Sequence, residues 1–208
     1  EGEQTIDGKT YTFDEKGVGT LKQDKWNQLL ETYENDSSVN QLIFVQYQGG
    51  SNAQVILYEK QNGSWKEDFS CQGYVGGNGI DKVKEGHRTP PTGVFDFTKA
   101  FGIKDNPGAK LPYTKLNPYL YWCGDEQWYN TLVDVRETPH ECSGEHLISY
   151  VPHYNYVLAI DYNPECIFGK GSAIFLHCAG SNPYTGGCVA VSESNMIRIM
   201  QTVDKGAK

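Results

Sequence analysis

The sequence lacks the features that mark several large classes of protein. No apolar run among its 208 residues approaches the ~20 residues of a transmembrane helix, and no signal peptide is visible. Basic residues are scarce, with 18 Lys and Arg against 26 Asp and Glu, and the net charge is −8. Without a basic stripe to neutralise phosphates, nucleic acid is disfavoured as a partner. None of the six cysteines forms a Cys-x-x-Cys pair.

The composition that is present fits one substantial domain, with room for a small appendage. Hydrophobic residues make up 38% and charged residues 21%, which is ordinary for a globular chain. Aromatics reach 12%, including 14 tyrosines, and a β-rich core explains them better than a glycan-binding surface does. The chain begins at Glu1 without a methionine, so we interpret it as a fragment of a longer protein.

Residues 1–20 read as a short hairpin. Thr10–Phe13 alternates like a strand between turns at Asp7-Gly8 and Lys16-Gly17. A single hairpin is barely stable alone, and such units normally stack in series. The pattern Asp-Gly-Lys-x-Tyr-x-Phe-Asp-x-x-Gly resembles the cell-wall-binding repeat of the choline-binding type. The resemblance implies that residues 1–20 are the remnant of a repeat array, with a cell-wall polymer as partner.

Residues 21–38 are predicted to form a helical linker. Asp24 can cap a helix over residues 21–35, whose apolar face comprises Trp26, Leu29, Leu30 and Tyr33. A second helix is predicted at the C-terminus, where Ser192 can act as the cap. Its apolar residues share one face and are Met196, Ile199, Met200 and Val203.

Residues 39–208 are predicted to form one mainly β domain, with a β-sandwich favoured over a parallel sheet. Short runs with a period of two are separated by Gly- and Asn-rich turns. The expected strands are 41–48, 53–59, 64–70, 94–97, 156–162, 172–177 and 188–191. Residues 105–145 are irregular, and a long irregular segment in a compact domain usually serves as a lid or binding loop.

The most informative stretch contains His177 and Cys188. An apolar run ends at His177, and the small residues that follow close on Thr185-Gly186-Gly187-Cys188 before a second apolar run. A thiol needs a nearby base to become a nucleophile, because the thiolate is the reactive form. Neighbouring side chains on a strand face opposite ways, so Cys178 should point away from His177. The amides of residues 186–188 could donate to an oxyanion during acyl transfer.

Two separated motifs resemble the L,D-transpeptidase catalytic domain, the YkuD-like family. One is Phe-Leu-His ending at His177, followed by Thr-x-Gly-Cys-Val-Ala around Cys188. The other is Thr89-Pro-Pro-Thr-Gly-Val-Phe95, which fits the family pattern Thr-Pro-x-Gly-x-Phe. Shorter matches are Trp128-Tyr-Asn130, Gly144-Glu-His-Leu147 and Ala159-Ile-Asp-Tyr-Asn163. The resemblance implies a β-sandwich with a few peripheral helices.

The resemblance also implies a reaction on peptidoglycan stem peptides, with no cofactor and no metal. Cys188 is then the nucleophile and His177 the general base. The thiolate attacks the bond before the terminal D-alanine of a tetrapeptide stem, and an amine of a second stem resolves the thioester as a 3→3 cross-link. Water as acceptor gives an L,D-carboxypeptidase instead. Carbapenems are expected to acylate the cysteine. With the repeat, the resemblance implies an extracytoplasmic, wall-associated location in a Gram-positive cell.

The expected substrate-binding residues come from the motifs and the lid. They are Trp122, Tyr129, Asn130, His146 and Thr185. Many family members carry a histidine two residues before the cysteine, where this chain has Gly186. His146 and His153 are the candidates to replace it, and ordinary polar loop positions explain them equally well.

Two non-catalytic roles for the remaining cysteines can be weighed. His140-x-Cys142-x-x-x-His146, with Cys123 earlier in the chain, uses zinc-ligand residue types, but no paired Cys-x-x-Cys or His-Glu-x-x-His spacing supports a metal. A Cys123–Cys142 disulfide across the irregular segment is favoured over it.

Two rival functions remain open at this stage. A sortase-like transpeptidase also uses His, Cys and Arg in that order, and Arg198 follows Cys188, but the Leu-x-Thr-Cys signature is missing. A wall-binding module with an incidental cysteine is the non-enzymatic alternative.

Overall fold

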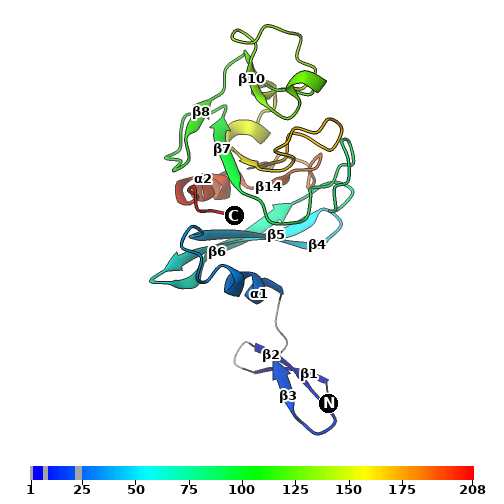
Figure 1. Cartoon of the computed structure of the whole chain (residues 1–208), viewed down its shortest axis with the longest axis vertical. Helices are drawn as coiled ribbons and strands as arrows, with labels where there is room; N and C mark the ends of the chain where they lie inside the picture. Colours follow the sequence, from blue (N-terminus) through cyan, green and yellow to red (C-terminus); the bar gives the residue numbers. More distant parts are fainter. Residues whose placement is uncertain (1, 7–8, 22–24) are drawn as a thin grey trace.

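A computed structural model of the protein describes residues 2–6, 9–21 and 25–208, and the main element is a mixed eight-stranded sheet (Figure 1). The strands lie in the order β4-β5-β6-β14-β13-β12-β7-β8. Their bounds are β4 Gln41–Gly49, β5 Asn52–Gln61, β6 Ser64–Tyr74, β14 Val189–Val191, β13 Phe175–Cys178, β12 Val157–Ile160, β7 Phe97–Gly102 and β8 Tyr113–Lys115. Two pairings, β13 with β14 and β7 with β8, are parallel, and the others are antiparallel.

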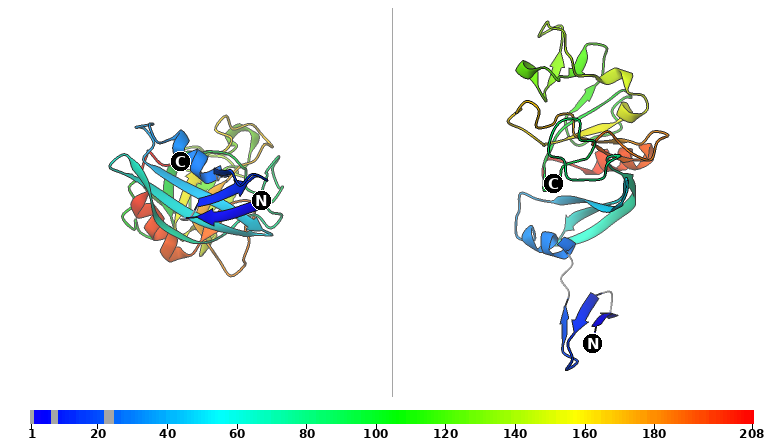
Figure 2. Two further views of the ribbon diagram at one scale, coloured as in Figure 1. Left: turned by 90° about the horizontal axis from the view of Figure 1, so that it is seen from below. Right: turned by 90° about the vertical axis from the view of Figure 1, so that its right-hand side faces the viewer.

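The sheet folds over a shared apolar core, as a sandwich requires. One face of β5 buries Ala53, Val55 and Leu57, because alternate side chains of a strand share a face. The same core contains residues of β12, β13 and β14 and the apolar face of α2, Glu193–Thr202. Figure 2 shows the β4–β6 layer beneath the rest of the domain. The predicted β-sandwich is therefore confirmed.

A second core lies on the other face of β12 and β13. It contains Phe101, Trp122, Tyr154 and Phe175, whose rings contact one another in edge-on and stacked pairs. Strand β13 separates the two cores by simple alternation, with Leu176 and Cys178 in the first and Phe175 in the second. His177 lies on the Phe175 side, so the prediction that Cys178 faces away from it is confirmed.

The segment 105–145 is largely irregular, as predicted, and forms the upper part of the domain in Figure 1. Its regular parts are β8 at the edge of the main sheet, η1 Glu126–Trp128 and a small sheet in the order β10-β9-β11. The strands are β9 Leu120–Trp122, β10 Leu132–Asp134 and β11 Glu145–His146. Two further short helices, η2 Leu147–Ser149 and η3 His153–Asn155, lead into β12.

Helix α1, Lys25–Thr32, is packed onto the main sheet. Its residues Trp26 and Leu29 contact a cluster formed by Val39, Leu42 and Phe44. The helix therefore belongs to the body of the domain, whereas the sequence suggested a linker. Asp24, its expected cap, lies outside the described residues. The C-terminal helix is confirmed, with Ser192 accepting a hydrogen bond from the Asn195 amide at its start.

The N-terminal residues form a separate three-stranded antiparallel sheet, more than the single hairpin expected. Its strands are β1 Gly2–Ile6, β2 Lys9–Phe13 and β3 Gly19–Leu21. The predicted turn at Lys16-Gly17 is present, and the Asp14 carboxylate accepts hydrogen bonds from the Lys16 and Val18 amides at 2.9 and 2.8 Å. The expected turn at residues 7–8 lies outside the described part of the chain.

One predicted strand is displaced along the chain. The sequence suggested residues 94–97, but β7 begins at Phe97 and runs to Gly102. The preceding residues cannot join the ladder, because Pro90 and Pro91 lack amide protons and Gly93 has a φ of +143°.

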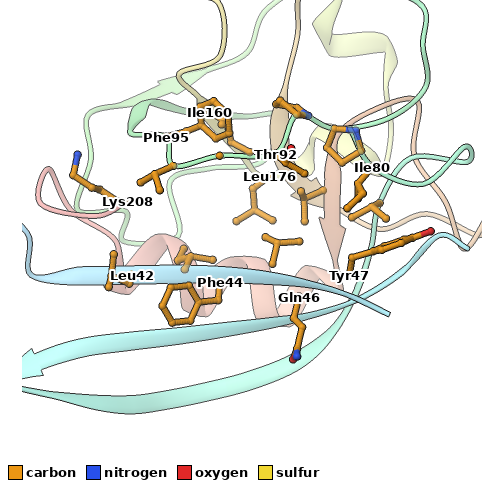
Figure 3. Close-up of a pocket in the computed structure, with 18 of the residues that line it drawn as sticks. Leu42, Phe44, Gln46, Tyr47, Ile80, Thr92, Phe95, Ile160, Leu176 and Lys208 are labelled. Carbon is orange, nitrogen blue, oxygen red and sulfur yellow. The ribbon is translucent and has the colours of Figure 1, made fainter. Parts of the chain in front are cut away.

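An apolar cleft of about 560 Å³ opens between β4 and the loop that precedes β7. Figure 3 shows Leu176 above β4 and the Phe44 ring below it, where Phe44 packs against Trp26 of α1. No cysteine or histidine is among its described lining residues. The described lining of this cleft therefore offers neither a thiol nor an imidazole, so the predicted Cys–His pair lies elsewhere.

Candidate active site

A second cavity, of about 840 Å³, contains both residues singled out by the sequence. Cys188 and His177 line it together with the loop 184–187 and parts of the irregular segment. Both side chains are almost buried, with exposed fractions of 8% and 6%. Its size is in the range of ligand pockets, and it combines a thiol with an imidazole. These features make it the candidate active site.

The parallel pairing of β13 and β14 brings the two residues to one place. Leu176 pairs with Val189 in this parallel ladder. The residues before them, Phe175 and Cys188, therefore lie side by side. The Phe175 amide donates to the Cys188 sulfur at 3.4 Å, and the thiol in turn donates to the Ala173 carbonyl at 3.2 Å. The nucleophile is thus anchored at the start of a buried strand, with its sulfur at the cavity wall.

His177 is held in one tautomer. Its Nδ1 lies 2.8 Å from the Cys178 carbonyl oxygen, which can only accept, so Nδ1 carries the proton and Nε2 keeps its lone pair. The rings of Tyr154 and His153 pack edge-on against it, with centroids 5.7 and 5.8 Å away. Burial, with a smaller contribution from His153, lowers the pKa of His177 to about 4. The imidazole is therefore neutral at pH 7 and able to accept a proton.

Cys188 is a neutral thiol in the resting protein. Burial raises its pKa to about 12, and the nearby Glu145 carboxyl adds to the shift. A buried thiolate has lost its hydration, so the protonated form is favoured. The pair therefore rests as thiol and neutral imidazole, and the thiolate must form when a substrate is bound.

The loop before Cys188 is shaped by two hydrogen bonds of Thr185. Its hydroxyl donates to the Cys188 carbonyl at 2.7 Å and accepts from the Gly187 amide at 3.2 Å. The Gly187 amide, one of the three expected oxyanion donors, is thus already occupied. The amides of Gly186 and Cys188 have no partner among the described residues and are the better placed donors.

The two sequence motifs meet directly behind this loop. Gly187 has a φ of +137°, and a β-carbon there would lie 3.2 Å from the Thr89 carbonyl oxygen. Thr89 is itself buried, and Gly76 packs so closely on the preceding Arg88 that no side chain would fit. The Thr185 amide and carbonyl also bond to Val75 and Gly77. The upstream motif therefore supports the nucleophile loop.

Comparison with protein families places this geometry in a known context. The profile of the L,D-transpeptidase catalytic domain matches residues 24–208, which is most of the chain. The chain belongs to the L,D-transpeptidase family. No curated protein matches it. As an L,D-transpeptidase domain it has L,D-transpeptidase-type activity on peptidoglycan and works outside the cytoplasm. Within the described residues, no helix has the length and apolarity needed to cross a bilayer.

The expected substrate-binding residues of the L,D-transpeptidase domain divide into two groups. Trp122, Tyr129 and Thr185 line the catalytic cavity. His146 does not, because its ring stacks on Tyr121 with centroids 4.5 Å apart and is held by Pro118 and Ser149.

Asn130 has a structural role in place of the expected substrate contact. Its side-chain oxygen accepts from the Trp122 indole and from the Ala173 amide, at 2.9 and 3.1 Å, and its amide group donates to the carbonyls of Tyr162 and Asn163. All of its side-chain hydrogen-bonding groups are used within the protein, so it fixes the irregular segment to the connection between β12 and β13.

Glu145 is the cavity residue that the sequence reasoning missed. It lies in the Gly144-Glu-His-Leu motif, where the neighbouring His146 drew attention instead. Burial raises the pKa of Glu145 to about 6, and the Tyr154 hydroxyl donates to its carboxylate. His153 is also in the cavity. Of the two histidines considered as replacements for the one absent at position 186, only His153 is placed to act there.

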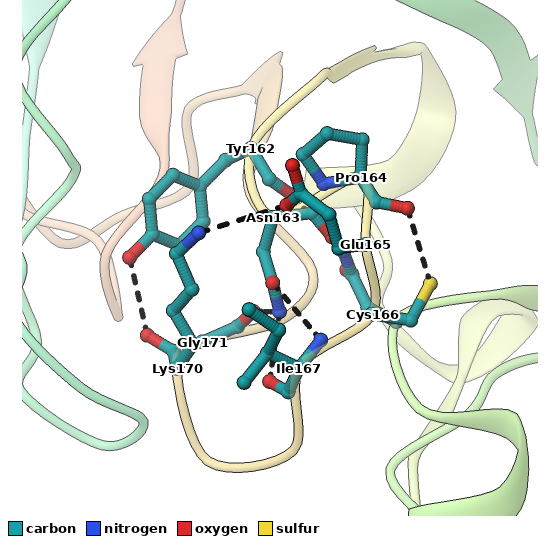
Figure 4. Close-up of polar contacts among 9 residues, drawn as sticks. Tyr162, Asn163, Pro164, Glu165, Cys166, Ile167, Lys170 and Gly171 are labelled. Atoms are coloured by element: carbon teal, nitrogen blue, oxygen red, sulfur yellow. Dashed lines mark hydrogen bonds and ion pairs between the residues drawn. The ribbon is translucent and has the colours of Figure 1, made fainter.

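The Asn163 motif stabilises another wall of the cavity. Asn163 is buried, and its side chain bonds to Ile167 and Gly171, so it closes the loop between them (Figure 4). Phe168 and Gly169 at the tip of this loop line the cavity. The motif therefore shapes the pocket without entering it.

Two other expectations are corrected. Cys123 and Cys142 are free thiols and form no disulfide; their side chains converge with His140 and Asp125. Arg198, the arginine that kept a sortase-like enzyme open, lies on α2 and binds Asp68 across the surface, away from the catalytic cavity.

Proposed function

We propose that the protein forms 3→3 peptidoglycan cross-links through an acyl-enzyme on Cys188. The donor is a tetrapeptide stem, and the bond broken is the one before its terminal D-alanine. The observation that carries the proposal is that Cys188 and a neutral His177 share one cavity large enough for a stem peptide. The cavity requires no metal or cofactor for this chemistry.

In the first step, Nε2 of His177 takes the proton of the Cys188 thiol as the sulfur attacks the scissile carbonyl. The amides of Gly186 and Cys188 donate to the oxygen that gains charge. His177 then returns the proton to the nitrogen of D-alanine, which leaves, and a thioester remains. Because the thiol is neutral at rest, its proton passes to His177 only as the sulfur attacks the bound carbonyl.

In the second step, the amine of another stem attacks the thioester. His177 accepts a proton from that amine, and Cys188 is released as the thiol. Water in place of the amine would give a tripeptide, the product of an L,D-carboxypeptidase. Trp122 and Tyr129 provide apolar surface beside the thioester, which supports a peptide acceptor over bulk water.

We also propose that the N-terminal sheet is a cell-wall-binding repeat in a longer array. The exposed antiparallel strands and the Asp14 turn support this, since such a unit buries little surface alone. Array binding would keep the catalytic domain at the wall of a Gram-positive cell.

The decisive experiment is incubation of the purified protein with tetrapeptide stems, with products identified by mass. We expect dimers that have lost one D-alanine, and free D-alanine in equal amount. Cys188→Ala should abolish both products, while Cys178→Ala, one strand position away from His177, should retain cross-linking. Tripeptide without dimer would identify water as the acceptor. Dimer formation by Cys188→Ala would refute the proposal.

A further inference from the structure

Four potential metal ligands converge at the base of the irregular segment. Cys123 follows β9, Asp125 precedes η1, and His140 and Cys142 lie before β11. One ligand atom from each of the four lies within 4.8 Å of every other. The Cys123 sulfur is 2.9 Å from Asp125 Oδ2 and 3.1 Å from His140 Nε2, and these two atoms are 3.4 Å apart. Ligands of tetrahedral zinc are separated by roughly 3.3–3.8 Å, so only small adjustments are needed.

In His140 and Asp125, the polar atom that points away from the centre of the cluster has a hydrogen-bond partner. That partner orients the other polar atom of the side chain as a ligand. His140 Nδ1 lies 2.7 Å from the Thr138 carbonyl, so Nδ1 carries the proton and Nε2 offers its lone pair to the cluster. Asp125 Oδ1 accepts from the Ser143 hydroxyl at 2.9 Å and Oδ2 from the Ser143 amide at 3.4 Å, and Oδ2 also faces the Cys123 sulfur at 2.9 Å. Metal-binding histidines and carboxylates are typically held in this way.

The centre of the cluster is rich in acceptors. His140 Nε2 and the Asp125 carboxylate bring lone pairs, and among the four side chains only the thiols of Cys123 and Cys142 have protons to donate to the centre, both weakly. Cys123 is fully buried, so water cannot supply the missing donors there. A cation at the centre would satisfy every group at once. A disulfide would use the two sulfurs and leave the imidazole and carboxylate without a role.

We propose that Cys123, Asp125, His140 and Cys142 bind a structural zinc ion. Two thiolates, one imidazole and one carboxylate form a closed four-ligand set of the kind that zinc takes in structural sites. Binding displaces the two thiol protons to solvent, and no oxidation or reduction takes place. Asp125 thus takes the place of His146, the ligand type suggested by the sequence spacing.

The site would fasten one wall of the catalytic cavity. Its ligands join the two ends of the excursion between β9 and β11, which carries Tyr129. Residues directly beside the ligands, namely Trp122, Gly124, Ser143, Gly144 and Glu145, line the same cavity. The irregular segment has little regular structure to hold it. A metal there would stabilise the segment in place of an apolar core, as structural metals do in small domains.

The test is metal analysis of the full chain purified under reducing conditions. We expect about one zinc ion per chain, and with cobalt in its place the absorption bands of tetrahedral thiolate coordination. Cys142→Ser and Asp125→Asn should lower zinc affinity by roughly 100-fold. Cys166→Ser and Cys188→Ala are the matched controls, because neither cysteine is among the four converging side chains, and both should keep the metal.

The cobalt spectrum of the unmodified chain decides the question even where a variant fails to fold. Absence of thiolate-to-cobalt absorption would overturn the proposal, as would a Cys123–Cys142 disulfide that persists in reducing buffer. Full zinc content in a folded Cys142→Ser variant would overturn it too. Since no turnover is measured, these outcomes are independent of the proposed transpeptidation.

Discussion

Burial shifts the pKa values of the two catalytic residues, His177 and Cys188, in opposite directions. His177 is kept neutral and able to accept a proton, whereas Cys188 is kept as a thiol. The same loss of hydration therefore keeps the imidazole unprotonated and the thiol protonated. Reactivity is held back until a substrate fills the cavity.

A carbapenem should acylate the chain once, at Cys188. The cysteine is the thiol that shares a cavity with a neutral imidazole, so it is the one that can be deprotonated as the ring carbonyl is attacked. Intact-protein mass spectrometry followed by peptide mapping checks this. An adduct on Cys178, which lies in the opposite core, would contradict the assignment.

Glu145→Gln should change how stability depends on pH. The pKa of Glu145 in the folded protein is raised from 4.5 to about 6, so the folded state favours the protonated carboxyl. That contribution is present below pH 4.5 and is lost as pH rises through 6. The variant should therefore gain about 2 kcal/mol in unfolding free energy relative to the parent between these pH values.

Denaturant unfolding of both proteins from pH 4 to 7.5 measures this difference. Glu141→Gln is the matched control for the substitution itself, because Glu141 is an exposed neighbour in the same segment. A flat difference for Glu145→Gln would show that its carboxyl is not held in the protonated form.

At the scale of elements, the nucleophile loop depends on two glycines with different requirements. Gly187 has a left-handed φ and approaches Thr89, whereas a β-carbon at Gly186 would meet nothing within 4 Å. The space at Gly186 also explains how relatives can carry a histidine there.

Gly187→Ala should lose most cross-linking activity and about 1–3 kcal/mol of stability, because a side chain at this φ is strained. Gly186→Ala should stay within about 0.5 kcal/mol of the parent. Thermal unfolding and product analysis on the same samples compare the two. Equal losses in both variants would show that the loop does not impose the geometry described.

At the scale of the whole molecule, the N-terminal sheet and the sandwich are built separately. None of the described residues before 25 belongs to any of the three apolar clusters, while α1 packs against Phe44 and its neighbours. Folding and catalysis should therefore depend on residues 25–208 and wall binding on the residues before them.

Removal of residues 1–24 should leave cross-linking of soluble stems within about twofold of the full chain, since none of the described residues in this range belongs to an apolar core. Binding to isolated cell walls should fall. Co-sedimentation with walls and turnover of soluble stems test the two parts separately. Unchanged sedimentation would place the wall-binding surface on the catalytic domain instead.

The sequence by itself determined the parts that follow from local rules. Strand alternation was enough to separate Cys178 from His177, and helical periodicity was enough to find α2 with its Ser192 cap. The His177 and Cys188 pair could be found because each residue lies at the end of a short apolar run. Family motifs then supplied the chemistry that spacing alone does not give.

Only the tertiary structure decided the rest. Glu145 rather than His146 enters the cavity. This could not be predicted, because the irregular segment has no periodicity that indicates which side chains face inward. The packing of Thr89 on Gly187, and the meeting of Cys123 with Cys142 and its two companions, join positions far apart in the chain. Contacts of this kind are set by how the sandwich and its loops close over the cores, and no local pattern encodes them.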